Sequence, residues 1–150
     1  MRKGSINRGK VKRTYRQEKK HFTQFSQEEL TYLEGEIRKL KKVIPSWHLV
    51  EKRDILVKKS DILKVIKDSD IKSLIIEYNE TLKSTGIDKR VVLRSRESYS
   101  VCIGDNTIEC NLCFVLSILK GEIITAYYND INDNHDSINW FRYNKDLKIF

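Results

Sequence analysis

The sequence contains no long run of apolar residues, and this absence limits the classes of protein to which the chain can belong. The first residues, MRKGSINRGK, lack the apolar segment of a secretory signal. No later segment reaches the roughly eighteen uninterrupted apolar residues of a membrane-spanning helix. We therefore expect a cytoplasmic protein that does not enter a membrane.

Cysteine is also scarce, with three residues in 150, and an odd number argues against a secreted disulfide framework. Cys110 and Cys113 have the CxxC spacing of half a zinc site, and Cys102 and His135 are conceivable further ligands. However, the segment has the pattern of a strand, in which residues three apart point to opposite faces. The sequence therefore favours buried thiols over a structural zinc site.

No internal repeat is visible, and charge is the main feature that divides the chain. Of its 29 basic and 21 acidic residues, nine basic residues and one acid lie in residues 1–20, so this segment carries the whole net charge of +8. We predict a basic flexible arm over 1–20 and a single domain over 21–150. A cationic arm gains affinity for a polyphosphate by releasing counterions, although solubilising tails have the same composition. The predicted nucleic-acid contacts in the arm are Arg2, Lys3, Arg8, Lys10, Lys12, Arg13 and Arg16.

The first half of the domain has the spacing of helices. Ser26 and Glu29 form a capping box ahead of leucines at helical spacing, and Pro45 is expected to end this helix. The segment 45–56 predicts a short second helix or turn, with the proline in its first turn. A third helix is expected to start with Ser60 as its N-cap.

The second half has the pattern of strands, separated by hairpin turns at 104–106 and 120–121. The fold expected is therefore α+β: N-terminal helices followed by a twisted antiparallel β-sheet meander of four or five strands. The predicted strands are 73–79, 90–95, 98–103, 107–119 and 122–129.

Basic and hydroxyl side chains recur on common faces of these elements. His48 and Lys52 share a helix face, and a nearby ammonium favours the neutral imidazole that a general base requires. A surface histidine beside an anchoring Trp47 fits the same spacing. Arg90 and Arg94 share a strand face and can clamp a phosphate, or can simply protect an edge strand.

Thr125 and Tyr127 alternate onto one strand face, where they can orient a phosphate or stack a base. Ordinary β propensity explains them equally well.

The stretch NDNHDSINWFRY, residues 132–143, allows a metal loop, a catalytic histidine, a nucleic-acid contact or a solvated turn. A calcium loop is excluded because His135 stands where the turn needs glycine, and Phe141 stands where the glutamate ligand belongs. A zinc pair is excluded because no histidine is nearby in the sequence. No metal or cofactor is predicted, and His135, Arg142 and Tyr143 are left as candidates for a metal-free phosphodiester site.

The order of the segments WHLVEKRDI, SDILKVIKD, IIEYN, RVVLRS, CFVLSILKGEIITAYYND and DNHDSINWFRY resembles small toxin-type ribonucleases of the barnase–EndoU–colicin–RelE-like (BECR) superfamily, found in phages and polymorphic toxins. The resemblance covers about residues 45–150. It implies a site made of a histidine and a basic residue from an early helix, an arginine from the sheet, and a histidine or tyrosine after GEIITAY. It also implies RNA as substrate and, as a further partner, a cognate antitoxin or immunity protein.

These patterns together lead to the hypothesis of a metal-independent endoribonuclease that cleaves cytoplasmic RNA through the 2′-hydroxyl, leaving a 2′,3′-cyclic phosphate. His48 and His135 would act as base and acid. Charge on the phosphorane would be stabilised and the phosphate positioned by Lys52, Arg90, Arg94, Thr125 and Tyr143. Two alternatives stay open: a phage-type regulator that binds nucleic acid without cleaving it, and an inhibitor that binds a host protein.

Overall fold

One sheet organises the protein in the computed structural model, which describes residues 16–45, 57–134 and 141–150. The strand order is β1-β3-β4-β5-β6-β2, and every neighbouring pair is antiparallel except β2–β6. The strands in the described ranges are β1 (Arg16–His21), β2 (Ile44–Pro45), β3 (Ile75–Lys83), β4 (Gly86–Ile103), β5 (Asn106–Ser117) and β6 (Glu122–Asp130).

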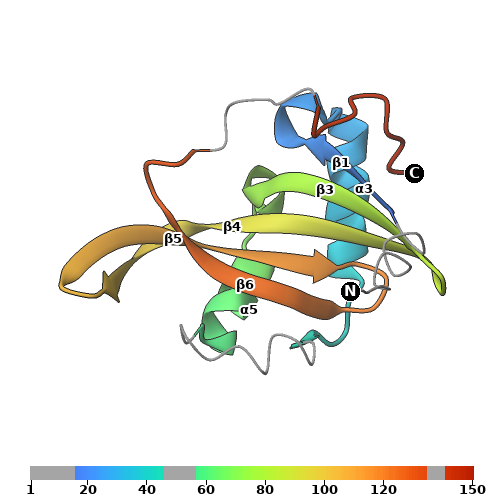
Figure 1. The fold of residues 1–150 in the computed structure, drawn as a ribbon. Coiled ribbons are helices and arrows are strands. Elements are labelled where there is room, and N and C mark those ends of the chain that lie inside the picture. Colours follow the sequence, from blue (N-terminus) through green and yellow to red (C-terminus); the bar gives the residue numbers. More distant parts are fainter. Residues whose placement is uncertain (1–15, 46–56, 135–140) are drawn as a thin grey trace, which may run out of the picture.

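Two α-helices, α3 (Gln27–Arg38) and α5 (Lys59–Ile66), pack on the same face of this sheet, as Figure 1 shows. Short 3-10 helices, η1 (Phe22–Gln24) and η2 (Ile71–Leu74), precede α3 and β3. Apolar residues at helical spacing on the helices and at alternate positions on the strands therefore face one another. We call the sheet face opposite the helices the outer face.

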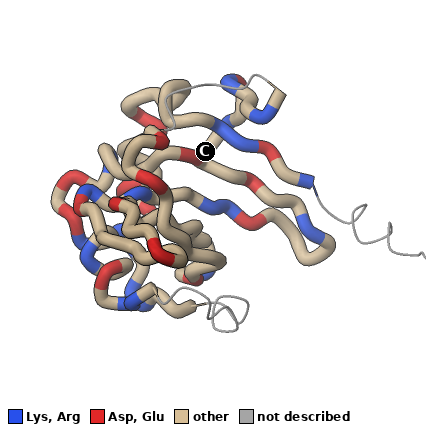
Figure 2. Tube along the Cα trace, turned by 60° about the vertical axis from the view of Figure 1, so that its left-hand side comes forward, with Lys and Arg blue, Asp and Glu red and all other residues tan. Residues whose placement is uncertain are grey.

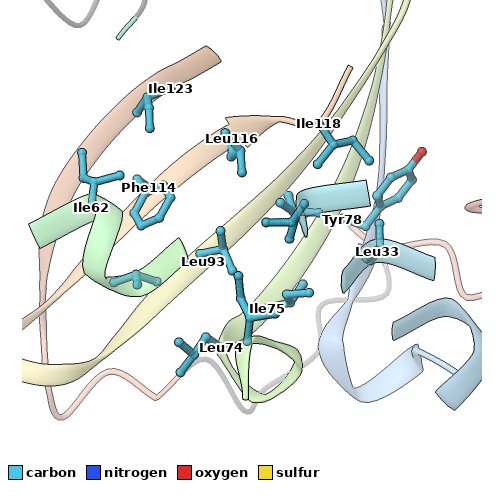
Figure 3. Close-up of a cluster of buried hydrophobic side chains, with 14 of the residues drawn as sticks. Leu33, Ile62, Leu74, Ile75, Tyr78, Leu93, Phe114, Leu116, Ile118 and Ile123 are labelled. Atoms are coloured by element: carbon cyan, nitrogen blue, oxygen red, sulfur yellow. The ribbon is translucent and has the colours of Figure 1, made fainter. Parts of the chain in front are cut away.

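The core lies between the helices and the sheet (Figure 3). Leu33 from α3 and Ile62 from α5 meet Leu93 and Phe114 from the two central strands, and each of these residues is at most 4% exposed. Burying a side chain of this size contributes about 1.5–3 kcal/mol, so this layer supplies most of the stabilisation of the fold.

The coarse prediction of an α+β domain is confirmed, but the predicted order and number of elements need correction. A strand, β1, precedes the helices. The sheet has six strands, and its two edge strands, β1 and β2, were not predicted. Residues 16–20 therefore belong to the sheet rather than to the arm. The sequence RQEKK contains no apolar residue and therefore no apolar–polar alternation that would indicate a strand.

The capping box of α3 is confirmed: Ser26 Oγ accepts from the Glu29 amide at 3.1 Å, and Glu29 Oε1 accepts from the Ser26 amide at 2.9 Å. The helix ends at Arg38, well before Pro45, which lies in β2. Ser60 is not the N-cap of α5; Lys58 occupies that position without a side-chain hydrogen bond. Residues 46–56 of the predicted second helix lie outside the described residues.

Strand β4 is a single strand of 18 residues, whereas two separate strands were predicted over 90–103. A register shift between Arg94 and Ser98 bends the strand at the predicted break without ending it. Both predicted hairpin turns are present, with Gly104 and Gly121 at φ values of 62° and 66°. A left-handed conformation of this kind is readily available only to glycine.

The C-terminal segment, residues 141–150, protects the edge strand β1 (Figure 1). The Asn144 amide donates to the Lys19 carbonyl at 2.9 Å, and Leu147 and Ile149 are buried in the core. In the described ranges, no helix is both long and apolar enough to cross a membrane.

Candidate functional site

A row of cross-strand neighbours on the outer face defines the candidate site. The register aligns one residue from each of five adjacent strands: His21, Glu77, Val92, Val115 and Thr125. Register shifts after Ile75 in β3 and after Val115 in β5 flank this row. Such bulges redirect side chains and are common beside functional sites.

A cavity of about 250 Å³ lies over this row. Val92 and Val115 give it apolar surface, and the C-terminal segment supplies one wall through Arg142 and Tyr143. The residues that line it are Lys19, His21, Ile76, Glu77, Asn79, Val92, Val115, Tyr127, Arg142 and Tyr143. Side chains of β1, β3 and the C-terminal segment thus converge although they are far apart in sequence.

Glu77 is the acidic residue in this lining. Its Oε1 accepts a hydrogen bond from the Tyr143 hydroxyl at 3.1 Å, and its Oε2 lies 3.9 Å from Lys19 Nζ. The Glu77 side chain is 15% exposed, so it is largely shielded from bulk water. The Arg142 guanidinium lies 5.6 Å from the centre of the Tyr143 ring. One carboxylate and two cations therefore share the cavity with a hydroxyl donor.

Both tyrosines of the cavity hold their protons strongly. Burial, followed by the neighbouring Glu77 carboxylate, raises the pKa of Tyr143. Burial of the ring, followed by the nearby Cys113, raises the pKa of Tyr127 to about 12, although 39% of the Tyr127 surface remains exposed. At neutral pH both hydroxyls are therefore neutral hydrogen-bond donors rather than bases.

His21 has a structural role at the end of β1. Its side chain is 2% exposed, and Nδ1 accepts from the Thr23 amide at 3.2 Å, which caps η1. The same nitrogen lies 2.8 Å from Thr23 Oγ1. The ring meets Tyr143 edge to face at 5.0 Å between centroids, so His21 supports the tyrosine that binds Glu77.

Arg90 and Arg94, the predicted phosphate clamp, lie on the outer face but bind acceptors of the protein itself. Arg90 Nε lies 2.7 Å from a carboxylate oxygen of Asp88, which is 3% exposed. Arg94 donates to Asn111 Oδ1 at 2.9 Å, to the Asp130 carbonyl at 3.1 Å and to the Asp133 carbonyl. Neither arginine lines the cavity.

The other predicted site residues divide into three groups. Arg142 and Tyr143 line the cavity, and Thr125 lies in the same cross-strand row on β6 without lining it. Arg16 is exposed at the start of β1. The remaining predicted residues lie outside the described part of the chain: His48, Lys52, His135, Arg2, Lys3, Arg8, Lys10, Lys12 and Arg13.

Sequence reasoning missed Lys19, His21, Glu77 and Asn79 as site residues. A signal for two of them exists, because Glu77 and Asn79 are alternate polar residues in the otherwise apolar run SLIIEYN. Alternation of this kind indicates a polar second face on a half-buried strand. Nothing local indicated Lys19 and His21, because only the pairing of β1 with β3 places them beside Glu77.

The cysteines do not contribute to the cavity. Cys110 and Cys113 are buried and free, and Cys102 is exposed near the end of β4. Burial raises the pKa of the Cys113 thiol to about 11, which makes it unreactive at neutral pH. Among the described residues, no group of three or more His, Cys, Asp or Glu side chains is arranged to hold a metal ion.

Figure 2 shows both signs of charge interspersed along the described chain. This pattern agrees with the balance of twenty basic and twenty acidic residues in 21–150. Residues 21–150 therefore carry no net charge, and the excess of positive charge lies in residues 1–20.

Comparisons with known protein families, with curated proteins and with solved structures found no match. The chemistry of the cavity is therefore the basis for assigning a function.

Proposed function

We propose that the protein is a metal-independent endoribonuclease whose reaction centre is the cavity on the outer face. The observation that supports this most is the position of Glu77, whose carboxylate shares the cavity with Lys19, Arg142 and the Tyr143 hydroxyl. For phosphodiester cleavage by an internal hydroxyl, a proton acceptor can serve as the base, and two cations and a neutral donor can stabilise the developing charge.

In the proposed reaction, Glu77 accepts the proton of a ribose 2′-hydroxyl while the 2′-oxygen attacks the adjacent phosphorus. The bond from phosphorus to the 5′-oxygen breaks, and a protonated acid delivers a proton to that oxygen. The products are a 2′,3′-cyclic phosphate and a 5′-hydroxyl. Glu77 takes the role of base that the sequence hypothesis gave to a histidine, and His48 or His135 remains the proposed acid.

Charge that develops on the phosphorane would be stabilised by Lys19 and Arg142, with the Tyr143 hydroxyl as a further donor. Removal of one such donor typically lowers turnover by about 10²–10³-fold. Arg90 and Arg94 would contribute indirectly, because their bonds to Asp88 and to the Asp130 carbonyl stiffen the strands under the cavity. Thr125 would lie further along the same row. DNA would not be cut, because it lacks the attacking hydroxyl.

The basic segment before β1 would supply affinity for RNA in this proposal. Residues 1–15 contain six basic residues and no acid, and they lead directly into the strand that carries Lys19. Contacts with single-stranded RNA reduce the logarithm of the binding constant by about 0.7 per phosphate for each tenfold increase in salt. Truncation at residue 15 should therefore weaken both binding and its salt dependence, while leaving β1 intact.

The test is cleavage of labelled total RNA by purified protein in EDTA, with wild type beside Glu77→Gln. Because the substitution keeps the shape of the side chain but removes the base, cleavage should decrease by about 10²–10⁴-fold. The matched control is Glu97→Gln, which removes a 53%-exposed carboxylate far along β4. His48→Ala and His135→Ala identify the acid. Undiminished cleavage by folded Glu77→Gln would exclude Glu77 as the base.

A non-enzymatic RNA-binding regulator is the second candidate, and the internal bonds of Arg90 and Arg94 favour it. Guanidiniums already satisfied by the protein are poor phosphate clamps, because a phosphate would have to replace bonds that the fold uses. This candidate predicts a salt-sensitive shift of RNA on a gel without any cleavage, lost on removal of residues 1–15. It also predicts that Glu77→Gln leaves the shift unchanged.

A further inference from the structure

Tyr127 is an exposed aromatic residue at the cavity. It lies on β6 opposite Cys113, borders the cavity, and keeps 39% of its surface exposed. An aromatic ring that remains accessible at a cavity offers a surface on which a flat ligand can stack.

The rings or hydroxyls of several other tyrosines have partners within the protein. The Tyr78 hydroxyl donates to Glu80 at 2.9 Å, and the Tyr143 hydroxyl donates to Glu77. The Tyr32 ring stacks on Phe150 at 4.9 Å between centroids. Of the two tyrosines that line the cavity, Tyr143 already contacts Glu77 and His21, whereas Tyr127 is 39% exposed and offers its ring to a ligand.

The rest of the lining suits a flat heterocycle. Val92 and Val115 provide apolar contact beside the Tyr127 ring. Asn79, 7% exposed, accepts from Thr81 Oγ1 through its Oδ1 at 2.9 Å, so its amide nitrogen remains as a donor at the cavity. An aromatic wall, apolar contacts and a polar group at the edge are the features with which proteins hold unstacked bases.

We infer that the cavity binds one unpaired nucleobase of a single-stranded RNA, stacked on the ring of Tyr127. This inference rests on the proposed function, because it takes RNA as the ligand of the cavity. It adds the substrate class: a base inside a duplex is paired and stacked, and it reaches a cavity only after it is turned out of the helix. The protein therefore selects single strands or loops over duplexes.

The experiment measures binding of a fluorescent, fully 2′-O-methylated single-stranded oligonucleotide, which lacks the attacking hydroxyl and stays intact. Tyr127→Phe keeps the ring and Tyr127→Leu removes it. Loss of one base–ring stack should raise the Kd of Tyr127→Leu about 10-fold, whereas Tyr127→Phe should bind like wild type. The duplex of the same sequence should bind weakly to all three proteins. Circular dichroism and a melting curve establish that each variant folds.

Two results would overturn the inference. If Tyr127→Leu binds the single strand as wild type does while wild type still cleaves total RNA, the stacking site is wrong and the ribonuclease proposal stands. Equal affinity of wild type for the duplex and the single strand would also exclude the inference. If instead the protein is not a ribonuclease, wild type would bind the oligonucleotide but leave total RNA intact. This result differs from both of the results above.

Discussion

The ion pair between Lys20 and Glu29 connects three parts of the fold, and its removal gives a measurable prediction. Lys20 is 5% exposed; its ammonium lies 2.7 Å from Glu29 Oε2 and donates to the Leu147 carbonyl at 3.1 Å. The pair therefore joins β1, α3 and the C-terminal segment. Glu29→Gln isolates the charge, because glutamine at this position still completes the capping box with Ser26.

The Glu29→Gln variant leaves a buried ammonium without its counterion. Breaking a buried pair in this way typically costs about 3–5 kcal/mol, and the retained bond to Leu147 reduces this to about 2.5 kcal/mol. For a chain of this size, we expect a decrease in Tm of roughly 5–10 °C. Chemical unfolding followed by circular dichroism measures the free energy of unfolding.

A second variant distinguishes the lost charge from general damage. Lys20→Met combined with Glu29→Gln removes both charges, so it should be more stable than Glu29→Gln alone. A loss of less than about 0.5 kcal/mol for Glu29→Gln, which is the usual range for surface substitutions, would refute the ion pair as a stabilising contact.

Three further predictions concern a pair of glycines, the pH dependence of stability through Cys113, and the reactivity of the cysteines. A Cβ at Gly121 would lie 2.5 Å from the Lys42 carbonyl oxygen at a left-handed φ, so Gly121→Ala should lower the free energy of unfolding by about 2 kcal/mol or more. Gly35→Ala in α3 meets nothing within 4 Å and should raise it by about 0.5–1 kcal/mol; the opposite order in urea denaturation would contradict the packing described. The raised pKa of Cys113, about 11 against a usual 9.0, contributes stability that is complete below pH 9 and is lost as pH rises through 11, and denaturation at pH 8, 10 and 11.5 should show this decrease. In the native protein a thiol reagent should titrate the exposed Cys102 and spare Cys113, and two or more fast-reacting thiols would contradict the burial described.

Local signals predicted the elements that local interactions determine. The capping box of α3 and the glycine turns at Gly104 and Gly121 were correctly placed, because each depends on a few adjacent residues. The apolar run of β5 indicated a central strand buried on both faces. The coarse α+β class followed from the change of period between the two halves of the chain.

The features that the sequence did not predict depend on pairing between segments that are distant along the chain. Strand β1 has a polar, basic sequence, and only its pairing with β3 makes it a strand. The same pairing brings Lys19 to Glu77, so the core of the candidate site could not be found from either segment alone. Spacing placed Arg90 and Arg94 on one face, but it could not reveal that Asp88 and the Asp130 carbonyl bind them.

Analysis of the ends of the RNA products tests the central proposal most directly. Wild-type protein in EDTA is incubated with a short single-stranded RNA and with the same sequence carrying 2′-O-methyl groups throughout. The proposed reaction predicts fragments with a 2′,3′-cyclic phosphate and a 5′-hydroxyl from the first substrate and none from the second, since methylation removes the attacking hydroxyl. An unmodified RNA that stays intact, or fragments that appear equally from both substrates, would contradict a ribonuclease built around Glu77.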